Sequence, residues 1–355
     1  MQKTDEIPET LLLRVELPQD YPETATTYAA EFFVVDEEKA TSAFCSGETF
    51  TRTEYPWGSH YRYETDPGFT KYISIKNGSE QHGTTAMGGL SYVVSSDEED
   101  SPENNGHRNW WNNSLRKKHA WEYGAGDLVN VNEELNECPQ ADLSFGTLSE
   151  VLKEVEEKMT LCGFPEVQRY AADACSAEIL NQNRSIYNAS LQGKFKTGSI
   201  RTEFSTDDEY YYVTYRQIVD KIPLSAIYWF VNTDIDTNSV TFTEINLFYG
   251  KSGLLELNAE GLYSVGAPIS TAPVISPEDA LDVFLQQYNQ SKHGETSEIV
   301  NFELNYVKIV GQDGMRLRPA WIITTKTSQS ESEMIEIYVV LADSGALLKT
   351  DTDTR

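Results

Sequence analysis

The chain has 355 residues and a mass of 40.0 kDa, which is enough for about two domains. Hydrophobic residues make up 39% of it, so it has the material for the packed cores that disordered chains lack. The 28 basic and 56 acidic residues give a formal net charge of −28, which argues against nucleic acid and against anionic membrane surfaces as partners. No apolar run reaches the roughly 20 residues of a transmembrane helix, so we expect no transmembrane span in this chain.

Residues 1–146 have little helical periodicity. Short stretches rich in β-branched and aromatic residues alternate with Pro and Gly, which is typical of strands separated by turns. We therefore predict a β-rich N-terminal domain over 1–146. Its expected strands cover 11–17, 28–35, 60–63, 69–76 and 90–94.

Residues 147–275 begin with a strong helix signal. Thr147 and Glu150 form a capping-box pattern, and apolar residues follow at the helical spacing until Gly163 ends the pattern. Aromatic and alternating segments at 209–215 and 240–248 then indicate strands. These elements predict an α+β unit, a helix on an antiparallel sheet.

Residues 276–355 repeat this order. Ser276 is placed to cap a helix with Pro277 in its first turn, and strands are expected at 302–310, 319–325 and 334–341. The segment 266–276, which contains two Pro and no charge, is predicted to be a short, stiff linker.

Two similar turns support an internal duplication. Ser252-Gly253 and Ser344-Gly345 each follow an apolar strand end and precede a Leu-Leu pair. The middle unit is about 37 residues longer, and the extra residues fall between 166 and 208. Chance convergence of two ordinary hairpins is the alternative. The predicted fold class is α+β, with a β-rich N-terminal domain followed by two tandem helix-on-antiparallel-sheet units.

The sequence contains no metalloprotease, serine-hydrolase, Walker or dinucleotide-binding motif, and its five His are scattered. Asp234-Ile-Asp-Thr-Asn238 resembles the start of a calcium loop, but Ser239 replaces the Gly such loops need, so we interpret it as a polar turn. We predict no catalytic, cofactor or metal site, and a protein that is not an enzyme.

One segment stands out as a candidate binding site. Trp110, Trp111, Trp121 and Tyr123 lie beside the basic cluster 116–118, and exposed indole rings with polar neighbours are suited to sugars or peptides. The competing interpretation is that these rings pin a long loop to the first domain's core.

The four cysteines form no disulfide framework. They fit small buried apolar residues, with a single Cys162–Cys175 bridge as an option in an oxidising compartment. The first residues lack an apolar signal core, so either the protein is cytosolic or a targeting segment precedes this sequence.

Three features mark the C-terminal segment, namely Ser276-Pro-Glu-Asp-Ala-Leu, the strand with Trp321, and Asp343-Ser-Gly-Ala-Leu347. This pattern resembles PepSY-type units and their relatives among the membrane-anchored extracytoplasmic regulators of the Gram-positive cell-wall two-component system. The resemblance covers about 75 residues well and 147–257 more loosely. In the middle unit Lys251 replaces the Asp, and 210–212 take the place of the Trp.

This resemblance implies binding or inhibition of partner proteins outside the cytoplasm, with structural motif residues and no active-site residue. It also implies a lipoprotein or otherwise anchored protein whose signal precedes this chain. Our leading hypothesis is an extracytoplasmic, non-enzymatic protein that binds a protein or peptide partner. A secreted glycan-binding protein or hydrolase using 110–123 is the alternative, and a peptidase inhibitor is a third option.

Overall fold

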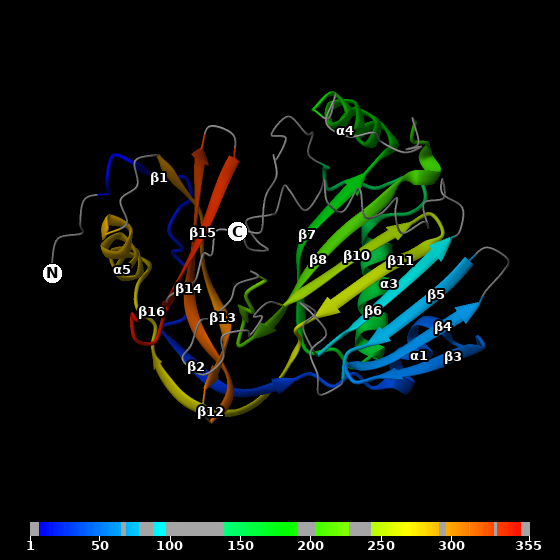
Figure 1. The fold of residues 1–355 in the computed structure, drawn as a ribbon, viewed down its shortest axis with the longest axis horizontal. Helices are drawn as coiled ribbons and strands as arrows, with labels where there is room; N and C mark the ends of the chain where they lie inside the picture. Colours follow the sequence, from blue (N-terminus) through cyan, green and yellow to red (C-terminus); the bar gives the residue numbers. More distant parts are fainter. Residues whose placement is uncertain are drawn as a thin grey trace.

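The computed structural model describes residues 7–64, 69–77, 88–96, 138–190, 203–226, 243–290, 296–311, 313–329 and 332–348. They form two large β-sheets with helices packed on them (Figure 1). The predicted α+β class, with a strand-rich N-terminal region, is confirmed.

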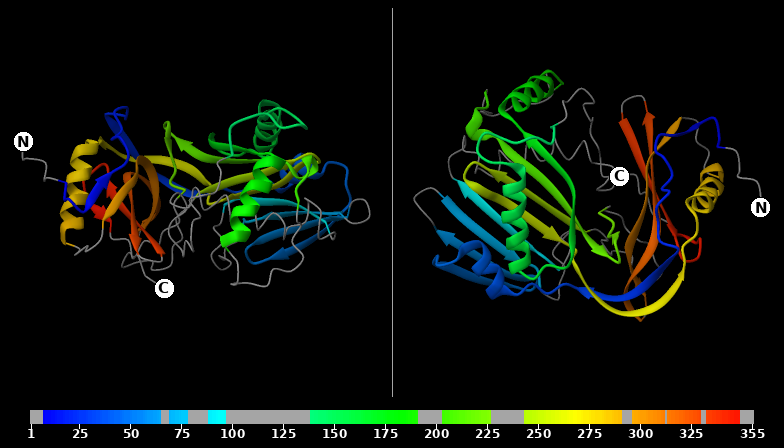
Figure 2. Two further views of the ribbon diagram at one scale, coloured as in Figure 1. Left: turned by 90° about the horizontal axis from the view of Figure 1, so that it is seen from above. Right: turned by 180° about the vertical axis from the view of Figure 1, so that it is seen from behind.

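The smaller sheet is built mainly from the C-terminal part of the chain. Helix α5, Pro277–Gln290, covers its outer face, away from the larger sheet (Figures 1 and 2). Its strands are β1 (Leu11–Leu13), β13 (Ser297–Gly311), β14 (Gly314–Gln329), β15 (Ser332–Leu341) and β16 (Leu347–Leu348), with β2 (Thr24–Phe32) beside β14 and β12 (Tyr263–Pro273) beside β2.

The larger sheet carries helices α1 (Glu37–Cys45) and α3 (Leu148–Leu161), and α3 lies across its strands (Figure 2). Helix α4, Ala177–Ser190, connects β7 to β8. In spatial order the strands are β3 (Phe50–Tyr55), β4 (Gly58–Glu64), β5 (Phe69–Ile75), β6 (Leu90–Ser96), β11 (Gly253–Glu260), β10 (Glu244–Gly250), β8 (Tyr210–Val219) and β7 (Val167–Cys175), with the short β9 (Ile222–Pro223) on β8.

Hydrogen bonding runs across the predicted segments 1–146, 147–275 and 276–355. Strand β6 pairs with β11, with Val93 opposite Glu256, so strands of the first segment continue the sheet of the second. Strands β1 and β2 of the first segment join the smaller sheet instead. Residues 266–276, predicted to be a linker, lie mostly in β12, which pairs with β2 as a long ribbon between the two sheets (Figure 1).

The helix starts form as the sequence predicts. The Thr147 hydroxyl accepts the Glu150 amide hydrogen bond at 3.2 Å, and the Glu150 carboxylate accepts the Thr147 amide at 3.0 Å. Ser276 accepts the amide of Asp279 at 3.0 Å. The sequence prediction missed α1, although Asp36 caps it as an N-cap residue should, because the helix is short and only weakly amphipathic.

Alternation along β7 and β8 separates two cores. Tyr211 and Val213 face α3, whereas Tyr210 and Tyr212 face the opposite cluster with α4. This alternation excludes the Cys162–Cys175 bridge, because Cys162 is buried on the α3 face and Cys175 on the other. All four cysteines are free thiols here.

The repeated pattern in the sequence corresponds to repeated topology. Helix α3 is followed by β7, β8, β10 and β11, and helix α5 by β13, β14, β15 and β16, each set paired in that order apart from the short β9. The two Ser-Gly turns join the last two strands of each set, and Gly253 and Gly345 have φ of +103° and +68°. Helix α4 lies between β7 and β8, where the sequence places the extra residues of the middle unit.

The motif residues of the C-terminal unit hold the smaller sheet together. Trp321 is fully buried against α5, and its indole N–H donates to the carbonyl of Ile275 at 3.0 Å. Asp343 accepts three hydrogen bonds from Arg318, one from Nε at 3.2 Å and two from Nη2 at 2.7 and 2.8 Å, beside the Gly345 turn. These residues have structural partners, as the resemblance implies.

Replacing Trp321 by Ala should lower the free energy of unfolding by about 3–5 kcal/mol, because the change leaves a cavity under α5 and frees a buried carbonyl. Urea denaturation measures this. Trp57→Ala is the matched control, because Trp57 is half-buried beside Tyr55, and it should cost about 1 kcal/mol or less. Equal losses in the two variants would contradict the packing described here.

Candidate functional site

The candidate ligand-binding residues Trp110, Trp111, Trp121 and Tyr123 lie outside the described residues, as does Asp234–Asn238. Within the described part of the chain, no group of three or more His, Cys, Asp or Glu is placed to hold a metal ion. No helix in that part is both long and apolar enough to cross a membrane.

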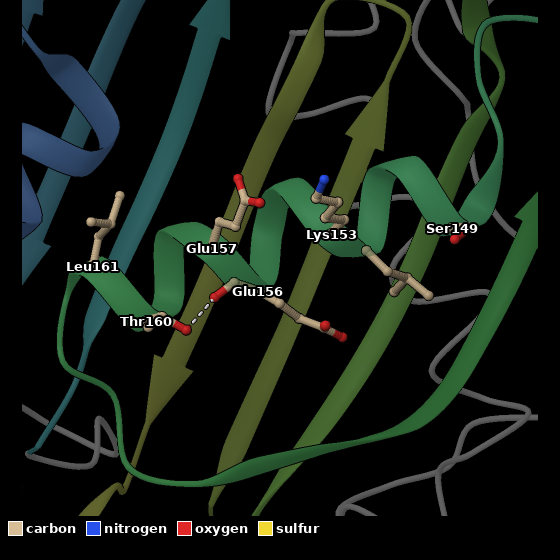
Figure 3. A pocket seen from close by; sticks show the side chains of 7 residues that line it. Ser149, Lys153, Glu156, Glu157, Thr160 and Leu161 are labelled. Atoms are coloured by element: carbon tan, nitrogen blue, oxygen red, sulfur yellow. Dashed lines mark hydrogen bonds between the residues drawn. The ribbon is translucent and has the colours of Figure 1, made fainter.

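A hollow of about 680 Å³ follows the outer surface of α3 (Figure 3). Its described lining comes from this one helix, and Glu156 and Thr160 point to one side of it while Lys153 and Glu157 point to the other. The Thr160 hydroxyl donates a hydrogen bond to the backbone carbonyl of Glu156 at 2.8 Å. Because no side chains of a second described element converge there, this surface is a weak candidate for recognition.

A second hollow, of about 390 Å³, lies at the junction of the two sheets. We call it the junction cleft. Strands β7 and β8 and the β8–β9 turn line it from the larger sheet, and β13, Trp321 of β14 and the segment before β2 line it from the smaller sheet. Side chains from separate parts of the sequence converge here. The described lining consists of Pro18, Asp20, Tyr21, Pro22, Gln168, Arg169, Tyr170, Arg216, Ile218, Lys221, Ile222, Pro223, Phe302, Glu303, Leu304 and Trp321.

The described lining of the cleft is more basic than the rest of this acidic protein. Arg169, Arg216 and Lys221 provide three cations, against the two carboxylates of Asp20 and Glu303. Arg169 and Lys221 are exposed at the rim. The lining is therefore net positive in a chain of net charge −28, and it would attract an anionic ligand.

Arg216 is the centre of the cleft wall. Its side chain is buried, its Nη1 donates to Glu303 at 2.7 Å, and its guanidinium carbon lies 3.7 Å from the centroid of the Tyr170 ring. Asn305 also donates to Glu303, at 3.2 Å. The ion pair joins β8 of one sheet to β13 of the other, so it fixes both walls of the cleft relative to each other.

The β8–β9 turn beside the cleft is strained. Asp220 and Lys221 have φ of 49° and 67°, the two positive values at non-glycine positions in the described chain. Each such residue costs of order 1 kcal/mol unless neighbours hold it. Tyr28 holds this turn by donating to the Asp220 carboxylate at 2.5 Å, and this hydrogen bond and burial both raise the pKa of Tyr28. The left-handed conformation of this turn places Lys221 at the cleft rim.

Two sheet edges border the cleft. Among the described residues β7 pairs only with β8, and on its other side the Ala174 amide bonds the carbonyl of Pro139. Strand β13 pairs with β1 only over Ser297–Ile299, and the carbonyl of Tyr306 accepts the amide of Ser225. Backbone groups of 168–170 and 302–304 therefore lie on edges that no described strand covers.

Sequence patterns did not identify this site, because its residues come from five separate segments. One signal was present. Arg216 interrupts a strand of aromatic and β-branched residues, and a charge in a strand buried along its whole length requires a partner. Nothing in the sequence names Glu303 as that partner.

Replacing Glu303 by Gln should lower the free energy of unfolding by about 1–3 kcal/mol, because it leaves the buried Arg216 with a neutral acceptor. Glu298→Gln on the same strand is the control, because the Arg14–Glu298 pair is exposed and screened by solvent, so its loss should destabilise the protein much less. Urea denaturation compares them. A loss in Glu303→Gln no larger than in Glu298→Gln would rule out a structural role for the buried pair.

Comparison with known proteins gives a likeness of fold. No protein-family model matches the sequence, and no curated protein sequence matches it. The crystal structure of an uncharacterized protein from Eubacterium rectale is similar over 97% of this chain and 92% of that chain, with a TM-score of 0.63 and 12% identity. The Bacillus megaterium YpeB C-terminal domain aligns over 90% of this chain and 98% of its own, with a TM-score of 0.33 and 8% identity, a level that does not establish a common fold. The chain thus shares its fold with the Eubacterium rectale protein.

Proposed function

We propose that this protein is a non-enzymatic binding or regulatory protein that acts outside the cytoplasm of a Gram-positive bacterium. It binds an extended, acidic segment of a partner protein in the junction cleft. The observation that carries this proposal is the cleft itself, where basic and aromatic side chains meet two sheet edges that no described strand covers.

The edges suit an extended peptide. A peptide that adds to an exposed strand gains main-chain hydrogen bonds, and side-chain pockets then supply its specificity. Strand β7 offers 168–170 for such pairing, and β13 lies on the opposite wall. Tyr21 and Tyr170 provide aromatic surface for the peptide's side chains.

Charge sets the preference for acidic ligands. Arg169 and Lys221 stand at the rim in solvent, where they would steer an anionic segment and suppress basic competitors. Glu303 is engaged by Arg216, Asn305 and, at 3.4 Å, Tyr170, which suits a structural acceptor better than a group exchanging protons with a substrate.

The extracytoplasmic assignment rests on the resemblance of the C-terminal unit to PepSY-type regulators. Trp321, Asp343 and Gly345 occupy structural positions consistent with that resemblance. The proposal includes an anchor, such as a lipid on a segment preceding this chain.

Arg169→Glu and Tyr170→Ala should each weaken the binding of acidic peptides at least tenfold. The probe is a library of end-blocked eight-residue peptides made in acidic and charge-reversed basic forms, with binding followed by fluorescence anisotropy. The wild type should prefer the acidic form, and methylation of the peptide's backbone nitrogens should abolish binding, because strand addition needs those N–H groups.

Arg62→Glu and Tyr55→Ala are matched controls, because both residues are exposed on the far strands of the larger sheet. They should leave affinity unchanged. Equal binding of the acidic and basic libraries would refute the peptide-binding proposal. A loss of affinity in the control variants as large as in Arg169→Glu and Tyr170→Ala would also refute it.

Export is tested with the complete reading frame of the gene, fused at its C-terminus to a reporter enzyme that is active only outside the cytoplasm. We expect reporter activity and digestion of the protein by protease added to intact cells. An inactive reporter together with protection from protease would refute the extracytoplasmic assignment without affecting the peptide measurement.

A further inference from the structure

Two of the four cysteines face each other in the core behind the larger sheet. The Sγ atoms of Cys138 and Cys175 lie 3.1 Å apart, and both residues are buried. Cys175 ends β7, and Cys138 precedes the segment that leads into α3. The amide of Ala174 donates to the carbonyl of Pro139 at 3.0 Å, so the backbones beside the two thiols are already hydrogen-bonded.

The other two thiols do not compete for this position. Cys45 and Cys162 are buried in the cluster on the α3 face of the sheet, whereas Cys138 and Cys175 belong to the cluster on the opposite face. A β-sheet therefore separates the two sets. The Cys138–Cys175 pair can approach the roughly 2.05 Å of a disulfide bond by a small side-chain adjustment.

The environment of the pair fits a structural cross-link better than a reactive dithiol. Tyr210, Phe248 and Leu180 pack in the same cluster, and burial raises the pKa of the Cys175 thiol well above its ordinary value. The thiolate is the reactive form in disulfide exchange, so the pair in the folded protein reacts slowly.

We propose that Cys138 and Cys175 form an intramolecular disulfide when the protein folds in an oxidising environment. The electron acceptor is a donor disulfide, either a small-molecule disulfide or that of a thiol–disulfide oxidoreductase. The Cys138 thiolate attacks one donor sulfur and releases the other as a thiol. The Cys175 thiolate then displaces the remaining donor thiol from Cys138. The two cysteines lose two protons and two electrons, and the donor becomes two thiols.

The bond would close a loop of 37 residues that contains α3 and most of β7. Such a closure restricts the unfolded chain and thereby stabilises the folded one. It also secures the end of β7 remote from 168–170, which line the junction cleft. The inference concerns a covalent bond and does not rest on the proposed peptide binding.

The test refolds the purified chain from denaturant in a buffer of oxidised and reduced glutathione. Free thiols are then alkylated under denaturing conditions, and the digested protein is mapped by mass spectrometry. We expect two alkylated cysteines, Cys45 and Cys162, and one cross-linked peptide pair containing Cys138 and Cys175. Four alkylated cysteines, or a cross-link through Cys162, would overturn the proposal.

Thermal unfolding provides the second readout. Reduction should lower the melting temperature of the oxidised wild type by roughly 5–10 °C. Cys45→Ser is the matched control and should show the same shift, whereas Cys138→Ser should show none. A shift of equal size in Cys138→Ser would overturn the proposal. The peptide map of the wild type decides the question even if a variant fails to fold.

Discussion

The relative position of the two sheets depends on a buried carboxamide. Gln217 is fully buried on β8. Its side-chain Nε2 donates a hydrogen bond to the carbonyl of Tyr263 at 2.7 Å, and its Oε1 accepts one from the backbone amide of Tyr263 at 2.9 Å. Tyr263 is where the chain leaves the larger sheet and begins β12, which pairs with β2, which in turn pairs with β14. Both polar groups of the carboxamide are satisfied, so the crossing point is fixed without an unpaired buried group. The backbone is therefore hydrogen-bonded from one sheet into the other.

Arg216, the neighbour of Gln217, uses the opposite face of the same strand. Successive residues of a strand point to opposite sides, so Gln217 fixes the crossing strand while Arg216 reaches Glu303 on the smaller sheet. A buried ion pair gains little net free energy, because both groups lose their hydration. Its contribution here is positional. A fixed distance between β8 and β13 leaves the cleft between them a defined shape.

Local helices and turns could be predicted from the sequence, but the pairing of strands from distant segments could not. The capping box at Thr147 and the Ser-Gly turns are local patterns, and each formed where it was predicted. Most of the predicted linker at 266–276 lies in β12, because this uncharged, Pro-containing segment pairs with β2 from the start of the chain. Pairing between strands so far apart in the sequence leaves no local pattern, so the sequence prediction also missed the pairing of β6 with β11.

For the same reason, sequence patterns did not identify the cleft. The cleft lies beside the strained β8–β9 turn. Asp220 and Lys221 adopt left-handed backbone angles, although Asn-Gly or Asp-Gly in a two-residue hairpin would do so at lower cost. The hydroxyl of Tyr28, from the ribbon strand β2, holds Asp220 in place. The ribbon that fixes the two sheets therefore also stabilises the turn that carries Lys221 to the cleft rim. A glycine in place of Lys221 would therefore relieve the backbone strain of the turn, but it would also remove one of the two exposed cations from the cleft rim.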